Sequence, residues 1–178
     1  IHRKDKNGEN CIFFYSPGSV KWNLDSTSEQ FIHNINLYSD SCFFYLSSDV
    51  TPSAEPSVID PTPGNPGATI TTYIARSFYE EEEINIYQSG RQWFSDIIMD
   101  NLKKPYSFNF PNAISSKNAK ITVGSASRCT AEVPTMAVKI NSSNAYLIEY
   151  PRSSNSESAT WNESTWSVPA NNTITIDF

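Results

Sequence analysis

The chain has few charged residues and no long apolar run, and each shortage removes a class of protein. Charged residues make up 18% of its 178 residues and the formal net charge is -6, so no basic surface is available to neutralise a phosphate backbone. We therefore expect no nucleic-acid partner. No apolar stretch approaches the roughly 18 residues that a membrane-spanning helix needs, so no membrane span is expected.

Histidine and cysteine are also scarce. The chain has two histidines, His2 and His33, and three cysteines, Cys11, Cys42 and Cys129. No His and Cys spacing typical of a zinc site occurs, and no serine lies in a Gly-x-Ser-x-Gly turn. The residues therefore predict no zinc site of His and Cys ligands and no serine nucleophile in such a turn.

The cysteines leave several interpretations open. Cys11 and Cys42 both lie in apolar runs, where a free thiol usually behaves as a small buried hydrophobe. A Cys11–Cys42 disulfide is one alternative, and a reactive thiol is another. His33 is expected to be a partly buried strand residue, although a hairpin could bring it to Cys42 and create a thiol enzyme.

Polar uncharged residues and aromatics are abundant instead. Ser, Thr and Asn together supply 56 of the 178 residues, and aromatic residues make up 13%. The aromatics are too many for a disordered linker, and strands favour both aromatics and Thr. This composition is typical of an all-β secreted or surface module.

Short apolar runs and period-two alternation indicate many strands separated by turns. Strands are expected at 11–15, 31–38, 42–46, 69–79, 106–110, 119–123, 136–140, 145–150 and 173–178, with a tight turn at 141–144. One or two helical turns could form at 96–102. Five prolines between 51 and 67 predict an exposed loop there.

The predicted fold is all-β, with antiparallel sheets in a jelly-roll-like β-sandwich and a small N-terminal β lobe. The lobe with its Pro-rich loop and connecting segment spans 1–104, and the sandwich spans 105–178. The chain lacks an initiating Met, which indicates a piece of a longer protein. The last strand is accordingly expected to lack its partner.

An acidic run, three sequons and four tryptophans are the remaining local features. Glu80 to Glu83 predict a solvated edge, with a Ca²⁺ site or a basic partner as alternatives. No other cofactor is expected. The tryptophans could form a sugar-stacking platform, although packing is the expected use, with Trp161 and Trp166 on opposite faces of one strand. In so Asn-, Ser- and Thr-rich a chain, the sequons at Asn141, Asn162 and Asn171 are expected by chance.

One segment carries a family resemblance. Residues 79–94 read YEEEEINIYQSGRQWF, which resembles a signature that precedes the catalytic domain of gingipain-like cysteine peptidases, most of all the sortase of the type IX secretion system. Ser89, Gly90, Arg91, Trp93 and Phe94 match the pattern, whereas Ser95-Asp96 stand where it has Gly-Glu. Weaker matches flank this segment, so the resemblance covers about residues 11 to 150.

This resemblance implies a non-catalytic β-rich region at the surface of a cell, on the extracellular face of an outer membrane. The family's catalytic His and Cys lie in a later domain, and nothing here matches their surroundings. The implied partners are that downstream catalytic domain and secreted protein cargo. The alternative from another class is a carbohydrate-binding or adhesive surface module.

The candidate interaction residues follow from the same segment. They are Glu80, Asn85, Ser89, Gly90, Arg91 and Trp93. Gly90 could adopt a positive φ or allow a close approach, and Arg91 could stack on Trp93 while pairing with a nearby carboxylate. We therefore expect a structural clasp between the early lobe and the sandwich, or alternatively a surface for the catalytic domain or cargo.

Overall fold

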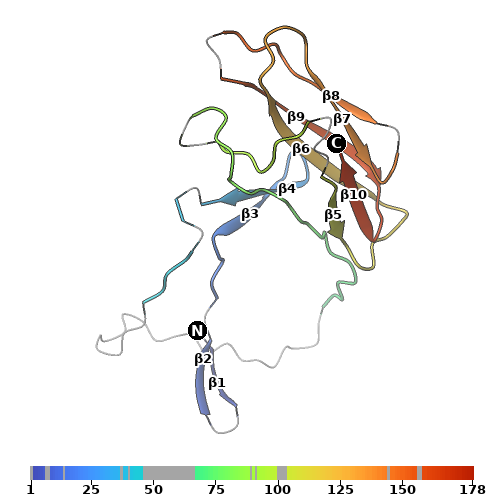
Figure 1. The fold of residues 1–178 in the computed structure, drawn as a ribbon. Coiled ribbons are helices and arrows are strands. Elements are labelled where there is room, and N and C mark those ends of the chain that lie inside the picture. The colour runs from blue at the N-terminus through green and yellow to red at the C-terminus, as the bar shows by residue number, and fades with distance from the viewer. Residues whose placement is uncertain are drawn as a thin grey trace. The chain divides into compact units, whose positions relative to one another are not determined.

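A computed structural model describes residues 2–6, 9–13, 15–36, 38–39, 41–45, 67–88, 90, 92–99, 104–143, 145–155 and 158–178. It divides the chain into two units, Ile1–Ile74 and Ala75–Phe178. Figure 1 draws both units as ribbons. Every residue of the described part is in a strand, turn or irregular segment, and no helix is present there, so none could cross a membrane.

Among its described residues, the first unit contains two antiparallel hairpins. Strand β1 (His2–Lys6) pairs with β2 (Glu9–Phe13), and β3 (Val20–Asp25) pairs with β4 (Gln30–Ile35). Asp25 stabilises the second turn, because its carboxylate accepts hydrogen bonds from the Thr27 amide and the Ser28 hydroxyl at 3.0 and 2.6 Å. No described apolar side chain of this unit is fully buried.

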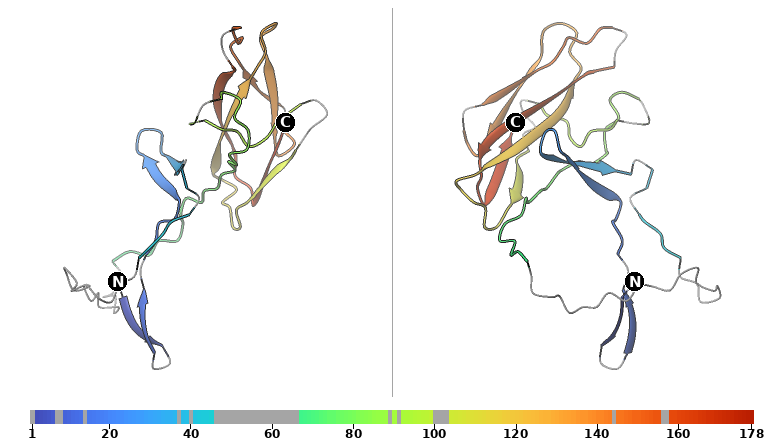
Figure 2. Two further views of the ribbon diagram at one scale, coloured as in Figure 1. Left: turned by 60° about the vertical axis from the view of Figure 1, so that its left-hand side comes forward. Right: turned by 180° about the vertical axis from the view of Figure 1, so that it is seen from behind.

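The second unit contains a sandwich of two antiparallel sheets. Its strands are β5 (Tyr106–Asn109), β6 (Asn118–Ser127), β7 (Thr135–Ile140), β8 (Tyr146–Glu149), β9 (Thr160–Pro169) and β10 (Thr173–Asp177). The four-stranded sheet has the order β5-β10-β7-β8, and β6 pairs with β9 along ten residues to form the other sheet. Figure 2 shows the two layers from two further sides. The predicted all-β antiparallel sandwich is confirmed.

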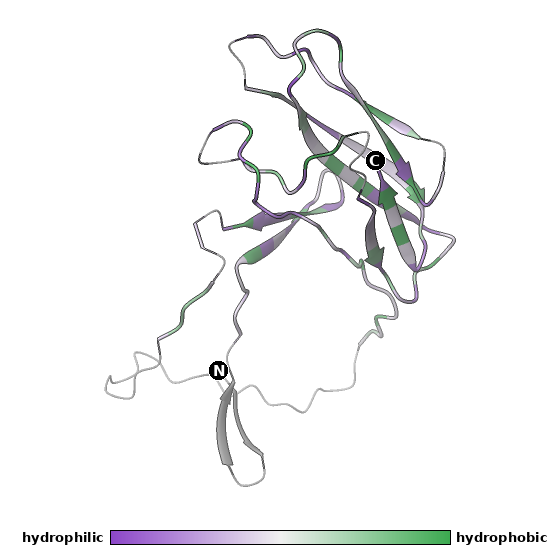
Figure 3. Ribbon diagram, in the orientation of Figure 1, coloured by the Kyte–Doolittle hydropathy of each residue, from purple (hydrophilic) through white to green (hydrophobic). Residues whose placement is uncertain are grey.

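The core lies between these two sheets. Ile121 and Val168 contribute from β6 and β9, and the four-stranded sheet contributes Val138, Ile140, Ile148, Ile174 and Ile176. Buried and less buried positions alternate along β7 and β10, which places Val138, Ile140, Ile174 and Ile176 on one face of their sheet (Figure 3). This burial of β-branched side chains is the main stabilising contribution of the unit.

Several strand predictions were correct and others were wrong. β10 does not lack a partner, because it pairs with β5 on one side and β7 on the other. Residues 69–79 form no strand and are mostly exposed despite their high β-propensity. Residues 42–45 are likewise irregular, and 96–99 form no helical turn, while Leu46 and 100–102 lie outside the described residues.

The predicted turn after β7 is confirmed. Asn141 and Ser142 have φ values of 51° and 60°, and the Ser143 amide donates to the Ile140 carbonyl at 3.0 Å. Two successive left-handed residues are typical of a type I′ turn, whose twist matches that of antiparallel strands. Asn144, the last residue of the predicted turn, lies outside the described residues.

Candidate functional site

The candidate site is the strap, which we define as residues 79–99 of the second unit, apart from 89 and 91, which lie outside the described residues. Its two arms are joined by an isolated antiparallel bridge between Ile84 and Phe94. Each of these residues donates its amide to the other's carbonyl at 2.8 Å. This double hydrogen bond closes the loop that carries the signature residues.

An aromatic contact fixes the strap to the outer face of the β6–β9 sheet. The Phe94 ring lies 5.8 Å from the Trp161 ring of β9 and 5.9 Å from that of Tyr87, measured between centroids. Trp161 in turn lies over Gly124 of β6, where a Cβ atom would be only 2.6 Å from Cζ2 of the indole. The missing Cβ of Gly124 therefore leaves the space that the Trp161 ring occupies, which we call the Trp161 notch. The ring in this notch packs against Phe94.

A polar cluster fixes the other end of the strap to the first strand of the sandwich. The Tyr106 hydroxyl of β5 donates to an Asp96 carboxylate oxygen at 2.6 Å. Lys104 Nζ donates to Asp96 at 3.1 Å and to the Tyr79 hydroxyl at 2.9 Å. The Tyr79 hydroxyl donates to Glu81 at 2.9 Å. Together these bonds connect both arms of the strap to the sandwich.

Ring contacts reinforce the same cluster. The rings of Tyr79 and Tyr106 lie 4.8 Å apart, and Lys104 Nζ lies 5.1 and 5.6 Å from their centroids. Tyr106 also packs edge-on against Phe178 at 5.6 Å. A cation between two aromatic faces adds to the hydrogen bonds and orders an otherwise exposed lysine.

The cluster shifts the acidity of its members. The hydrogen bond from Tyr106, followed by the hydrogen bond and charge of Lys104, holds the pKa of Asp96 below the ordinary value, against an opposing effect of burial. Burial, followed by the hydrogen bond to Asp96, raises the pKa of Tyr106. Hydrogen bonds to Tyr79 and Asp96 raise the pKa of Lys104. Asp96 is thus ionised and Lys104 charged at neutral pH.

The Asp96 shift predicts a pH dependence of stability. A carboxylate with a lowered pKa in the folded state contributes stability that is complete above the unfolded value of about 3.9 and is lost as the pH falls through the folded value. We expect Asp96→Asn to lower the free energy of unfolding at pH 7 by on the order of 1 kcal/mol, and to reduce its fall in acid. Denaturant titrations between pH 7 and pH 2 measure both effects.

Glu132→Gln is the matched control for this prediction. Glu132 is exposed, and its side chain makes no hydrogen bond or ion pair within the described part of the chain. The Glu132→Gln substitution should leave the fall in the free energy of unfolding at low pH unchanged. An identical fall at low pH for wild type and Asp96→Asn would contradict the assigned role of Asp96.

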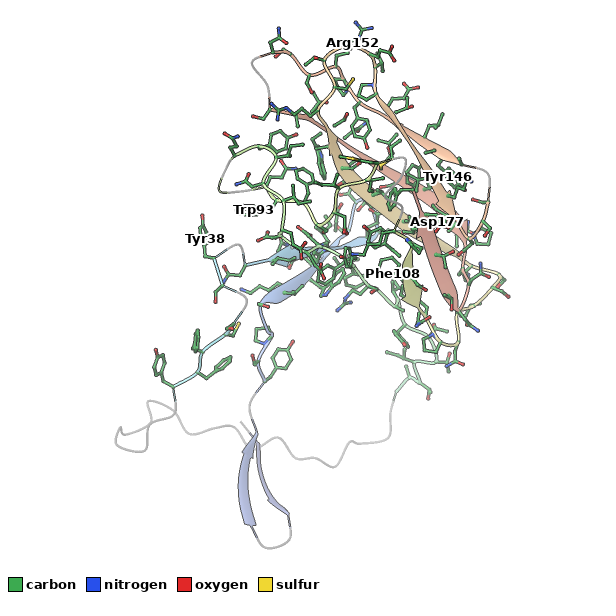
Figure 4. The ribbon with its side chains drawn as sticks, in the orientation of Figure 1. Tyr38, Trp93, Phe108, Tyr146, Arg152 and Asp177 are labelled. Carbon is green, nitrogen blue, oxygen red and sulfur yellow. The ribbon has the colours of Figure 1, made fainter. Side chains whose placement is uncertain are left out.

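The predicted site residues are only partly brought together. Ser89 and Arg91 lie outside the described residues, so the expected Arg91 stacking and ion pair stay predictions. Glu80 is exposed, and the Asn85 carbonyl accepts from the Gln88 amide at 3.3 Å. Trp93 is 37% exposed and lies on the strap (Figure 4).

The reason given for Gly90 was wrong. Its φ is not positive, and no atom lies within 4 Å of where a Cβ would be. Among the described residues of this loop, Gln88 adopts a left-handed conformation, with φ 52°. Phe94 and Asp96, which sequence reasoning did not select as site residues, make the contacts that fix the strap. The Ser95 hydroxyl, which accepts from the Glu81 amide at 2.7 Å, was missed as well.

The residues weighed for catalysis, His33 and Cys42, both belong to the first unit. The expected partly buried strand position of His33 is confirmed, and its ring lies 5.3 Å from that of Trp22 across the β3–β4 hairpin. Cys42 is a free, exposed thiol, so the expectation that it is buried was wrong, as was its proposed disulfide. The side chain of Cys11 lies outside the described residues.

Cys42 is expected to be the more reactive of the two described thiols. It is exposed, whereas Cys129 is half-buried beside β6. We expect iodoacetamide to modify Cys42 in the folded protein several times faster than Cys129, because access limits the reaction. Peptide mapping after short exposures measures the two rates, and urea-unfolded protein, where both should react alike, is the control. Faster modification of Cys129 would contradict the described exposure.

The positions of the described acidic residues and tryptophans do not support a metal site or a sugar-binding platform. Within the described residues, which include Glu80 to Glu83, no three His, Cys, Asp or Glu side chains are grouped as metal ligands would be. The tryptophans are mostly engaged in packing. Trp161 packs against Phe94, and Trp166 lies 5.1 Å from Tyr146, on the opposite face of β9 as expected.

Comparison with known proteins gives no relative for this arrangement. No family model, curated protein or solved structure matches the chain.

Proposed function

We propose that this chain is the non-catalytic, β-rich N-terminal region of a cell-surface cysteine peptidase of the gingipain-like, type IX sortase kind. Its role is to pack on a downstream catalytic domain or to guide secreted cargo to it. The sequence resemblance of residues 79–94 suggests this assignment. The geometry of the same residues is compatible with a contact surface.

The supporting observation is the outward face of the strap. Phe94 and Asp96 point to the sandwich, where they contact Trp161 and Tyr106. Their neighbours Trp93, Ile97 and Met99 are exposed apolar side chains. Apolar side chains on an anchored segment can bind a partner without the entropic cost of ordering a mobile loop.

A charge pattern accompanies this apolar face. Glu80, Glu81 and Glu83 are exposed on the other arm, which the Ile84–Phe94 bridge holds next to the first. An acidic rim beside apolar side chains favours a partner surface that combines apolar and basic residues. We propose that the downstream domain or its cargo supplies that surface.

Binding between this chain and the remainder of its parent protein tests the proposal. We expect Trp93→Ala to weaken the binding at least tenfold when it is measured well below the melting temperature of the variant, because the 37% of the Trp93 surface that is exposed in this chain would lie in the contact. Leu147→Ala on β8, which also removes an exposed apolar side chain, is the matched control and should bind like wild type.

Two results would refute the assignment. One is a parent sequence without a downstream α/β domain carrying a catalytic His and Cys. The other is peptide cleavage by the 178-residue chain itself, with the nucleophile mapped inside it. Saturable sugar binding with a change in Trp fluorescence would support the carbohydrate-binding alternative instead.

A further inference from the structure

The three sequons of the chain differ in how their asparagine side chains are used. They begin at Asn141, Asn162 and Asn171, and each has Ser or Thr two positions later. N-glycosylation needs the side-chain amide to leave the protein surface and enter a transferase. All three sites match the same sequence motif, but the structure gives their asparagine side chains different hydrogen-bond partners and different exposure.

The side chain of Asn141 is hydrogen-bonded to the four-stranded sheet. Its side-chain oxygen accepts from the Thr175 amide at 2.9 Å, and its own amide donates to the Thr175 carbonyl at 3.0 Å. The residue is half-buried and has a φ of 51°. Releasing this side chain would remove a bond that connects the β7–β8 turn to β10.

The side chain of Asn162 is also engaged in hydrogen bonds within the sandwich. Its Nδ2, the atom to which a glycan would be attached, donates to the Glu149 carbonyl at 2.6 Å. Its Oδ1 accepts from the Glu163 amide at 2.8 Å. The side chain is half-buried and links β9 to the end of β8. Entry of this nitrogen into a transferase would require that link to break.

Asn171 lies in the exposed turn between β9 and β10. Its side chain makes no hydrogen bond within the described part of the chain. The backbone on both sides is fixed, since the Ala170 amide donates to the Lys117 carbonyl at 2.9 Å and the Asn172 carbonyl accepts from the Phe110 amide at 2.7 Å. The turn therefore presents the Asn171 amide while its neighbours hold the turn in place.

The other two members of this sequon are compatible with recognition. The Asn172 side chain accepts from the Ala113 amide at 3.0 Å, which directs it to the protein. The Thr173 hydroxyl is exposed and makes one long bond, 3.2 Å, to the Asn109 side chain. Exchanging that bond for one to an enzyme leaves the β5–β10 backbone pairing intact.

We propose that Asn171 is a glycan acceptor, the one of the three sequons that the folded chain offers to an N-oligosaccharyltransferase. The co-reactant is an oligosaccharide carried on a polyprenyl diphosphate. A bond forms between Asn171 Nδ2 and the first sugar carbon as the bond from that carbon to the diphosphate oxygen breaks. The diphosphate leaves with the electron pair, and one amide proton passes to a base of the enzyme. This inference does not rest on the proposed function.

The test uses the folded chain, a single-subunit oligosaccharyltransferase that accepts Asn-x-Ser/Thr, and its polyprenyl-diphosphate donor. Cleavage after Glu163 separates Asn162 from Asn171, so mass spectrometry reads each site independently. We expect occupancy at Asn171 to exceed that at Asn141 or Asn162 at least tenfold. Urea-unfolded chain, diluted into the same reaction, should lose this preference, because the fold alone distinguishes the sites.

Three variants refine the test. Asn171→Gln and Thr173→Val should abolish the modification, and Thr173→Ser should retain it because it keeps the hydroxyl. Preferential modification of Asn141 or Asn162 in the folded chain would overturn the inference. So would an unmodified folded chain in a reaction where an acceptor peptide is converted.

Discussion

Replacing Ile148 by alanine is expected to lower the free energy of unfolding of the sandwich by about 2–5 kcal/mol, the largest single effect we predict. Ile148 is 0% exposed and lies in the core formed by the two sheets. The substitution removes three carbon atoms from this position, so the favourable free energy of burying them is lost. It also leaves a cavity, which β8 cannot easily fill because its backbone is held by pairing with β7. Denaturant unfolding followed by far-ultraviolet circular dichroism measures the change.

Leu147→Ala is the control for this prediction. Leu147 is the preceding residue of β8, but it points to the opposite face and is 59% exposed. We expect its truncation to change the free energy of unfolding by no more than about 0.5 kcal/mol. Equal effects of the two substitutions would mean that β8 does not lie in the described register.

Gly124→Ala is expected to destabilise the second unit by about 1–3 kcal/mol and to displace the Trp161 ring. The added Cβ would lie 2.6 Å from Cζ2 of the indole, a distance that the ring must relieve by moving. Because Phe94 packs on the same indole at 5.8 Å, the strap should loosen with it. Increased hydrogen exchange of the Ile84 and Phe94 amides, together with a changed Trp fluorescence, would report this coupling.

Gly90→Ala is the matched control within the strap. Gly90 has open space around the missing Cβ and no positive φ, so alanine fits without strain. We expect it to leave stability unchanged or to raise it slightly, because alanine restricts the unfolded chain more than glycine does. A loss of stability at Gly90 equal to that at Gly124 would refute the role assigned to the Trp161 notch.

The strands that sequence could predict are those in which apolar residues alternate regularly. β5, β7, β8 and β10 were predicted because their inward positions are occupied by residues such as Phe108, Val138 and Ile176. β9 was missed because its inward positions include Asn162 and Ser164, whereas β3 was overlooked although Val20, Trp22 and Leu24 alternate with polar residues. In β9 the polar groups face inward at the end where Asn162 bonds to the Glu149 carbonyl, a contact that no local pattern encodes.

The candidate site was predictable only as a region. The signature drew attention to residues 79–94, yet one anchoring group is Phe94, whose partner Trp161 lies far away in the sequence, and the other is Asp96, which lies beyond the signature and bonds to Tyr106. Trp161 becomes a neighbour of the strap only through the tertiary fold. Gly124 carried a weak signal, because a glycine inside an alternating strand often marks a close approach.

The position of β10 has a consequence for how the sandwich forms. This strand is inserted between β5 and β7, and its first residue bonds to Asn109 across 64 positions of the chain. Until it arrives, β5 has no hydrogen-bonded neighbour in its sheet and β7 has one open edge. Pairings of such sequence separation are slow to close, so we expect the arrival of β10 to set the rate at which the sandwich folds, and chains in which β10 has not yet paired to depend on protection of those edges.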